Sequence, residues 1–389
     1  MTSLRYLTSG ESHGPALNLI LEGMPAGVPI TLEAINHQLL RRQKGYGRGG
    51  RMKIETDQAI VMSGIRHGKT LGSPIAIRIE NKDWNVWQQE MSLWPISGDP
   101  KREVTSPRPG HADLSGGLKY NFKDLRNVLE RASARETTSR VAVGALCRQL
   151  LEHFGFVLAG HVVAVGDICW DGLRPSAKEI LERTEEAPMR CLDPQIETKM
   201  MARVDEAKKA GDSVGGVFEV IVEGVPPGLG SHVHWDRKLD GRLAQALCSI
   251  QAVKGVEIGE AFRQAHLPGS QVHDGIFYNA QQKKFFHKTN RAGGLEGGMT
   301  NGEPLILRGA LKPIATLYTP LHSVDVVTKK EFEAAVERSD TCVVPAASVI
   351  AENVVAITLA DAFLEKFGGD SLDEIRHNYE AYLQQIHSY

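Results

Sequence analysis

The loop at residues 107–113, with the sequence PRPGHAD, combines three side chains that bind anions or exchange protons: Arg108, His111 and Asp113. Its two prolines restrict the backbone dihedral φ and its glycine relaxes it, so the backbone is shaped while the polar side chains stay available. An arginine, a histidine and an aspartate on such a loop suit an anionic ligand and proton transfer to or from it.

The segment after this loop has apolar residues at helical spacing, and this pattern predicts one helix. The residues are Leu125, Val128, Leu129, Ala132, Val141 and Leu146. On that helix Arg131 and Arg135 would stand four residues apart on one face, with the hydroxyl of Ser133 near them. The alternative is an ordinary surface helix whose charges pair internally, as Arg126 could with Glu130. The preceding loop favours anion binding.

Residues 10–14 read GESHG and match GxSxG, the nucleophile motif of many hydrolases. That motif needs a strand before the serine and a helix after it. Here Pro15 leads into residues 16–22, which look like a strand, so a serine hydrolase acting through Ser12 is disfavoured. His13, in a tight turn between glycines, remains a candidate acid or base, against the alternative of ordinary turn chemistry.

Residues 41–53 carry six positive charges, no acid and four glycines. Glycine-rich backbone lets amides and guanidinium groups approach a phosphate or carboxylate closely. The alternative is an RNA-binding segment, which usually needs repeats and interleaved aromatics. There is one copy and one aromatic residue, Tyr46, so an anion-binding loop is favoured.

Four further segments have suggestive compositions. Residues 64–70 resemble a phosphate-binding Walker A loop but are one residue short, and a strand-like segment follows where a helix is required. Residues 290–302 are rich in glycine without the Rossmann pattern, so a flexible surface loop stays open as an alternative. Lys312–Thr316 offer a cation and a hydroxyl on a turn set by proline, and residues 338–341 bring an arginine and an aspartate between two expected helices, where they could simply pair with each other.

The composition is that of a globular protein, with 42% hydrophobic and 24% charged residues in 389. The net charge of −2 gives no overall field toward nucleic acid or membrane. Five cysteines without a CxxC pattern argue for reduced thiols and against a disulfide framework or zinc site, and no metal-ligand spacing is found. The N-terminus lacks an apolar signal region and no uncharged run is long enough to span a membrane. We expect a cytoplasmic protein with one large domain, residues 1–389.

The remaining patterns predict mixed helices and strands. Strands are expected at 3–8, 16–22, 156–165 and 215–223, and helices at 32–43, 236–253, from about 345 and from 371, the last opened by a capping box. Two more helices are expected between 176 and 211. Together these residues predict an enzyme that acts on a small polyanion by electrostatic clamping and acid–base catalysis, without specifying the reaction.

The chain resembles the chorismate synthase family, in order, from residue 4 to about 365. The matching segments are GESHG, RRQKGYGRGGRMKIE, PRPGHADLSGGLKY, LERASARETTSRVA, GDSVGGVFEV, VPPGLGSHVHWDRKLDGRLAQA, QAVKGVEIG, GGLEGGMTNGEP, KPIATL and RSDTCVVPAA. One minor departure is Asn121, where a small residue is common. The resemblance implies an α+β fold, a β-α-β sandwich with helices layered between antiparallel sheets, and a homotetramer.

The resemblance also implies a reaction and its groups. A lyase of this family eliminates phosphate from 5-enolpyruvylshikimate 3-phosphate by a 1,4-anti-elimination to give chorismate in the shikimate pathway of aromatic amino-acid biosynthesis, and it requires reduced FMN. Of the catalytic residues, His111 would protonate the leaving phosphate, His13 would sit by the N1 side of the flavin, and Asp340 would take the proton from N5. The arginines expected to clamp the substrate are Arg42, Arg48, Arg51, Arg135 and Arg338, of which Arg42 and Arg48 could instead contact the phosphate of NADP. The flavin would lie among Arg131, Ala132, Ser133, Gln251, Ala252, Gly297, Lys312, Pro313, Ile314, Ala315, Thr316 and Arg338.

Some members of the family reduce their own flavin with NADPH and others depend on a separate source of reductant. No appended domain is visible in the sequence, so NADPH is expected to act indirectly, through a separate flavin reductase. We expect no nucleic-acid or membrane partner.

Overall fold

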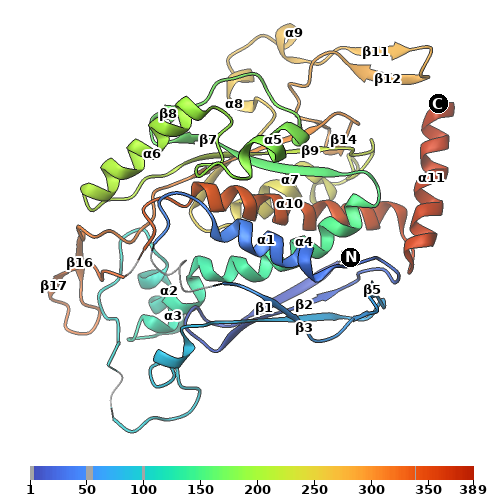
Figure 1. Cartoon of the computed structure of the whole chain (residues 1–389). Coiled ribbons are helices and arrows are strands. Elements are labelled where there is room, and N and C mark those ends of the chain that lie inside the picture. Colours follow the sequence, from blue (N-terminus) through green and yellow to red (C-terminus); the bar gives the residue numbers. More distant parts are fainter. Residues whose placement is uncertain (1–3, 50–55, 99–100, 338) are drawn as a thin grey trace.

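The computed structural model describes residues 4–49, 56–98, 101–337 and 339–389, and it has three layers (Figure 1). A four-stranded antiparallel sheet forms one outer layer, in the order β1 (Arg5–Ser9), β2 (Ala16–Glu22), β6 (Ile75–Glu80) and β3 (Ala59–Val61). A five-stranded antiparallel sheet forms the other, in the order β10 (Val253–Ile258), β15 (Leu305–Leu311), β9 (Gly216–Glu223), β7 (Val157–Val165) and β8 (Ile168–Cys169). The predicted arrangement of helices between antiparallel sheets is confirmed.

The middle layer holds the helices α1 (Leu32–Gln43), α4 (Thr137–Glu152), α7 (Leu239–Cys248) and α10 (Val344–Phe367). α10 is apolar on nearly every face, as a helix surrounded by protein must be. It is long and apolar enough to cross a membrane, but 94% of its most apolar stretch is buried, so it is the core helix. α4 packs closely on it because Gly144 has no side chain: a Cβ there would lie 2.4 Å from the Cβ of Asn353.

The strands of the four-stranded sheet alternate as a half-buried sheet requires. On β2, Leu17, Leu19 and Leu21 are buried against the helices, whereas Asn18 and Ile20 are exposed on the other face. One hydrophobic core, running from Leu4 to Ile375, continues through the helix layer into the five-stranded sheet. Packing of both sheets on the same helices thus fixes the position of one sheet relative to the other.

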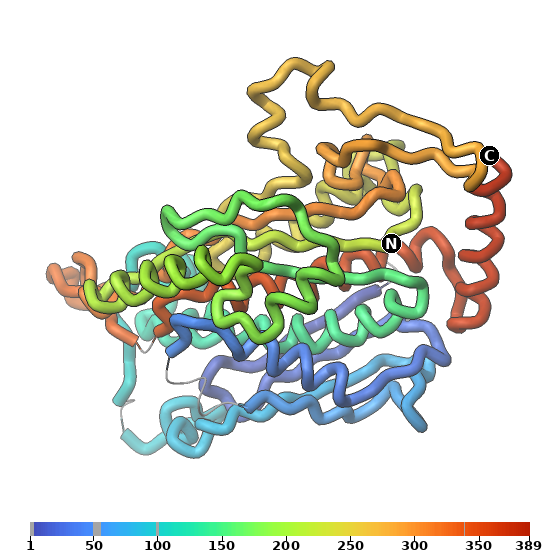
Figure 2. The backbone as a smooth tube through the Cα atoms, turned by 45° about the horizontal axis from the view of Figure 1, so that its top comes forward, coloured from blue at the N-terminus to red at the C-terminus, as the bar shows by residue number. Residues whose placement is uncertain are grey.

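Smaller elements connect and extend these layers. They are β4 (Ile65–Arg66), β5 (Lys69–Thr70), η2 (Trp84–Val86), α2 (Asp113–Tyr120), α3 (Arg126–Ala132), η3 (Ala134–Glu136), α5 (Ala177–Thr184), α6 (Pro194–Lys209), η4 (Trp235–Arg237), α8 (Ala261–Gln264), α9 (Gly269–Val272), β11 (Ile276–Asn279), β12 (Lys284–His287), β13 (Leu295–Glu296), β14 (Met299–Thr300), β16 (His322–Val324), β17 (Glu331–Glu333) and α11 (Leu372–Ser388). The β11–β12 hairpin forms an arm above the five-stranded sheet, and its tip approaches the end of α11 (Figure 2).

Helix starts were predicted well, because their signals are local. Thr31 caps α1 by accepting a hydrogen bond from the main-chain N–H of Ala34 (3.2 Å). Ser176 accepts from the main-chain N–H of Glu179 (3.1 Å) and Ser371 from that of Glu374 (3.3 Å), as the capping signals predict. Asn121 ends α2 with a φ of 57°, a left-handed conformation that asparagine tolerates better than most residues.

Three helix predictions were wrong. The helix expected across residues 125–146 breaks at Ser133, which is extended and caps η3 through the main-chain N–H of Arg135, so Arg131 and Arg135 do not share a helical face. The helix expected over 236–253 ends at Cys248, and Val253 already pairs with Leu311 in the sheet. Residues 339–341 follow the β16–β17 hairpin and not a helix.

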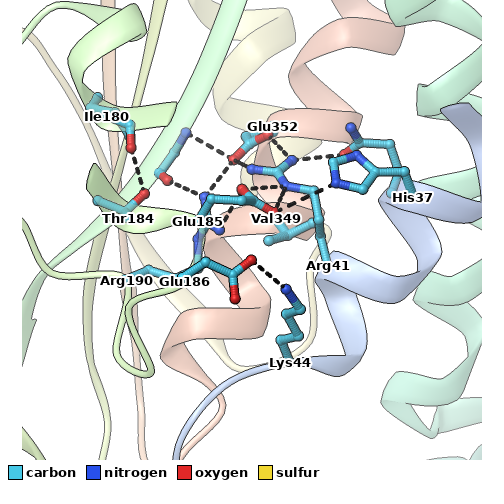
Figure 3. A network of polar contacts seen from close by, with 12 residues as sticks. His37, Arg41, Lys44, Ile180, Thr184, Glu185, Glu186, Arg190, Val349 and Glu352 are labelled. Atoms are coloured by element: carbon cyan, nitrogen blue, oxygen red, sulfur yellow. Dashed lines mark hydrogen bonds and ion pairs between the residues drawn. The ribbon is translucent and has the colours of Figure 1, made fainter. Parts of the chain in front are cut away.

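A buried ionic network ties the helix layer to the five-stranded sheet (Figure 3). Glu352 of α10 is fully buried and pairs with Arg41 of α1 (2.6 Å), Arg148 of α4 (2.8 Å) and Arg190 (3.3 Å). Its Oε1 also accepts the main-chain N–H of Gly160 in β7 (2.9 Å). Burial raises the pKa of this carboxyl, but the three arginines lower it more, to about 2.

We expect the substitution Glu352→Gln to reduce the free energy of unfolding by roughly 3–5 kcal/mol, because it leaves buried guanidinium groups without their counter-charge. Since the carboxyl pKa is about 2 in the folded state against 4.5 in the unfolded chain, the wild-type advantage is complete above pH 4.5 and is lost as pH falls toward 2. Urea unfolding of both proteins from pH 7 to pH 3 measures this. Glu182→Gln, in an exposed pair with Lys178, is the control and should change stability by less than about 0.5 kcal/mol. A pH-independent loss in Glu352→Gln would contradict the electrostatic account.

Candidate active site

A cavity of about 1190 Å³ opens at one end of the helix layer. Its walls come from the end of α1, the loop before α2, the α3–α4 junction, the turn before β10, the segment after β15 and the start of α10. Apolar side chains such as Leu129, Ile250 and Ile350 line it beside several cations. An apolar wall with a few placed charges suits a flat organic ligand that carries anionic groups.

His111 and its loop form the first acid–base group of the cavity. The Nδ1 of His111 lies 2.6 Å from Oδ1 of Asp113, which is fully buried. Arg108 donates to Asp113 Oδ2 (2.9 Å) and to Thr316 Oγ1 (2.9 Å), and its Nη2 lies 3.1 Å from His111 Nδ1. Burial raises the pKa of Asp113, but hydrogen bonds and charge from His111 and Arg108 lower it well below its ordinary value. Asp113 is therefore a carboxylate that holds both partners in place.

His13 forms the second acid–base group. Its Nδ1 lies 2.9 Å from both carboxylate oxygens of Glu130, and its ring stacks on Trp87 with 3.9 Å between the ring centroids. Glu130 also accepts from Arg126 (3.0 Å), four residues earlier on α3. Burial raises the pKa of Glu130, and the His13 and Arg126 contacts lower it below its ordinary value, so the acid is charged.

Asp340 pairs with a residue of the glycine-rich basic segment. Its Oδ2 lies 2.9 Å from Nη1 of Arg48, and its Oδ1 accepts the main-chain N–H of Gly49 (2.6 Å). Both side chains line the cavity. The long-range pair thus brings together the segment after α1 and the segment before α10.

Arg42 and Arg135 lie deeper, at the junction of α1 with α4. Arg135 is held by both carboxylate oxygens of Asp57 (2.7 Å each) and by Asn81 Oδ1 (2.9 Å). Arg42 donates to Thr137 Oγ1 (3.0 Å) and Ala134 O (2.8 Å), but its buried Nη1 has no hydrogen-bond partner among the described residues. Burial, aided by the like charges of Arg48 and Arg135, lowers the pKa of Arg42 to about 9, so this guanidinium is charged at neutral pH.

Most of the other expected site residues also line the cavity. They are Ala132, Ser133, Gln251, Ala252, Lys312, Pro313, Ile314, Ala315 and Thr316. Ala252 has a φ of 69°, and the buried Oε1 of Gln251 has no hydrogen-bond partner among the described residues. The Nζ of Lys312 donates to Gly110 O, which ties the segment after β15 to the loop of His111.

Two expected residues do not line the cavity. Arg131 donates to the main-chain oxygens of Gly10 (3.0 Å) and Thr8 (2.9 Å) and so braces the turn that carries His13. Gly297 lies in the turn between β13 and β14, where His232 is its nearest neighbour. Arg51 and Arg338 lie outside the described residues.

Sequence reasoning missed Trp87, Glu130 and Asp57 as members or supports of the site. Trp87 falls in an irregular segment, and Glu130 looks like an ordinary helical ion-pair partner of Arg126. Their roles depend on contacts with residues far away in sequence, such as the 117-residue separation between His13 and Glu130.

The alternative functions lack their structural context. GESHG joins the antiparallel strands β1 and β2, and no helix follows Ser12 as a hydrolase nucleophile requires. Residues 65–70 form the β4–β5 hairpin, which is not a phosphate-binding loop before a helix.

Fold and cavity together define an enzyme with paired acid–base groups and a cationic pocket for an anionic ligand. Comparison with known proteins specifies it further: the sequence model of the chorismate synthase family matches residues 4–364. A chorismate synthase of Brevibacillus brevis is 58% identical, with 98% of this chain and 100% of that protein covered. One of Geobacter metallireducens is 56% identical, with 99% and 100% covered. A crystal structure of chorismate synthase superposes with a TM-score of 0.80 at 44% identity, covering 99% of both chains.

The chain therefore belongs to the chorismate synthase family. It is a lyase of the shikimate pathway, which leads to the aromatic amino acids.

We expect Asp113→Asn to reduce the free energy of unfolding by roughly 3–5 kcal/mol, because Arg108 loses its buried counter-charge. Asp236→Asn is a matched control, since Asp236 also binds the histidine two residues before it (2.7 Å) but in an exposed pair. Asp236→Asn should change the free energy of unfolding by no more than about 0.5 kcal/mol. Urea unfolding followed by circular dichroism compares them; equal effects would show that the buried network adds no stability.

Proposed function

We propose that this cavity binds 5-enolpyruvylshikimate 3-phosphate together with reduced FMN and eliminates phosphate to form chorismate. The observation that carries the proposal is that two histidines, each with a buried carboxylate on Nδ1, line one cavity together with Arg42, Arg48 and Lys312. The substrate brings one phosphate and two carboxylates, which match this excess of cations. Family membership supports the same reaction.

The residues around the cavity fit a flavin. The segment Lys312–Thr316, the turn at Gln251–Ala252 and Ser133 offer a cation, polar atoms and apolar surface on one wall, and Gln251 Oε1 is buried without a partner among the described residues. Reduced FMN, when bound, supplies the electron density that helps phosphate leave. Arg131 and Gly297 remain candidate flavin residues by resemblance, as does Arg338, which lies outside the described residues.

His111 is the residue that gives a proton to the leaving phosphate. Asp113 accepts Nδ1–H of the ring, so the transfer would use Nε2, which lies 3.3 Å from Arg108 Nη2. Arg108, already held by Asp113 and Thr316, adds positive charge beside the ring and favours a phosphate there.

His13 and Asp340 complete the acid–base set. His13 holds a proton near the flavin at the end of the cavity walled by Trp87, and Glu130 balances the resulting positive charge. Asp340 accepts a proton in the last step, and Arg48 together with the N–H of Gly49 keeps its carboxylate in place.

The anionic groups of the substrate bind Arg42, Arg48 and Arg135, with Arg51 and Arg338 as further candidates. Arg42 is the strongest candidate, because its buried Nη1 makes no hydrogen bond with a described residue and lies 4.0 Å from Asp57 Oδ2. Asp57 already neutralises much of the charge of Arg135, so Arg135 mainly orients the substrate and adds less to its affinity. Arg42 or Arg48 contacting a nicotinamide phosphate of NADP is the alternative, favoured if the protein reduces its own flavin.

We infer one domain over residues 1–389, supported by the continuous core, and a cytoplasmic homotetramer, supported by resemblance. A separate flavin reductase, drawing on NADPH, supplies the reduced cofactor.

The proposal is tested by anaerobic incubation of the purified protein with the enolpyruvyl substrate and dithionite-reduced FMN. Chorismate absorbance and released phosphate should rise in equal amounts, and neither should form with oxidised FMN. His111→Ala should lower the rate by about 10²–10⁴, the range for loss of a general acid. Phosphate without chorismate would contradict the elimination, and turnover by His111→Ala at the wild-type rate would contradict its role.

Arg42→Met should raise the dissociation constant for the substrate by about 10- to 100-fold, because a charge-assisted hydrogen bond contributes about 1.5–3 kcal/mol. Titration calorimetry in the presence of oxidised FMN measures this without turnover. The control is Arg376→Met, which removes an exposed arginine of α11 paired with Asp373. If both variants bind as the wild type does, Arg42 is not a substrate ligand.

A further inference from the structure

Glu130 makes more contacts with the His13 turn than a counter-charge needs. Its Oε2 accepts the main-chain N–H of His13 (2.8 Å), both carboxylate oxygens face His13 Nδ1, and its main-chain oxygen accepts the N–H of Ser12 (3.0 Å). Glu130 itself is only 2% exposed. It therefore fixes both the backbone and the ring of His13.

One face of the imidazole is covered as well. Trp87 stacks on the ring with an angle of 24° between the planes, and Arg102 lies 4.0 Å from the indole centroid. With Nδ1 facing Glu130 and one ring face covered, Nε2 is the ring nitrogen through which a ligand of the cavity exchanges a proton.

We propose that Glu130 is a positioning residue for His13: it selects the Nδ1–H tautomer, aims Nε2 at the ligand and stabilises the imidazolium form. This inference rests on the proposed acid–base role of His13. Glu130 does not line the cavity, so its effect passes through the histidine.

Several other charges surround His13 and enter the pH dependence. Arg126 shares Glu130 Oε1 and also contacts Glu337 (3.1 Å), so it weakens the field of the carboxylate at the histidine. Arg102 adds positive charge beyond Trp87, and Asp83 and Glu103 line the same cavity. Among the described residues, Glu130 is an acid within 2.9 Å of the ring nitrogen, and for this reason its removal should have a large effect.

The experiment follows the titration of His13 in the full-length protein by NMR of ring-labelled histidine, with the signal assigned from His13→Asn. In Glu130→Gln the midpoint should move about one pH unit lower, because the attraction of an opposite charge is lost. The high-pH limb of kcat/KM, measured with reduced FMN, should move down with it. We expect kcat to fall about 10- to 100-fold, with a smaller change in KM, as for other groups that orient a functional histidine.

Two further variants decide the sign and exclude a merely structural effect. Glu130→Asp keeps the charge, so the His13 midpoint should return most of the way to the wild-type value. Arg126→Gln removes the competing cation, so the midpoint should lie above the wild-type value. The matched control is Glu219→Gln. Glu219 is a buried acid beside a histidine, His161 (3.2 Å), and an arginine, Arg308 (2.7 Å), but it lies in β9 away from the cavity. Glu219→Gln should lower the free energy of unfolding and leave the pH profile of kcat/KM unchanged.

The outcomes separate this inference from the proposed function. An unchanged His13 midpoint in Glu130→Gln and Arg126→Gln overturns the positioning role, even if His13→Ala is inactive. A shifted midpoint with an unmoved kcat/KM limb also overturns it, because Glu130 would then act on a histidine that does not limit the reaction. Full activity of His13→Ala would instead overturn the catalytic role assigned to His13, while the NMR titration would still report on the contact itself.

Discussion

The buried carboxylate of Glu352 holds the three helices that also build the active site. It joins α1 through Arg41, α4 through Arg148 and α10 through its own backbone. The same three helices also reach the cavity: Arg42 near the end of α1, Thr137 at the start of α4, and Ala347 and Ile350 near the start of α10 line it. A shift of one helix would break these ion pairs in the buried interior, where an unpaired charge is strongly destabilising. The network therefore fixes the relative positions on which the cavity depends.

Neighbouring arginines show how closely the two regions are joined. Arg41 points into the network and binds Glu352 and Glu185, whereas Arg42, the next residue, contacts the α4 start and lines the cavity. Both are buried, and successive residues on a helix point about 100° apart. The core network therefore helps to hold the cavity wall in place, and a change in the network should reach Arg42 through α1.

How much of this could be predicted depends on the range of each signal. Helix starts at Thr31, Ser176 and Ser371 were predictable because a cap and its partner lie within three residues. The break at Ser133 was not, since the apolar spacing continues across it. The candidate residues were reached through ordered motifs that resemble a family, and most of them do meet in one cavity. The carboxylates that support them, Glu130 and Asp57, were missed because each is recognised only by a partner far away in sequence.

The cavity's cations are already partly neutralised by the protein itself. Asp57 binds Arg135, Asp113 binds Arg108, Asp340 binds Arg48, and Glu130 binds Arg126. Such pairing lets arginines stay buried and oriented without a ligand, because each charge is compensated before binding. Two of these acids also face a histidine, so a single carboxylate can balance an arginine and a proton on imidazole. A polyanion that binds in the cavity would pair with the arginines. The carboxylates would then be freer to stabilise protonated histidines. In the proposed reaction, anion binding and proton supply would then be coupled through shared carboxylates.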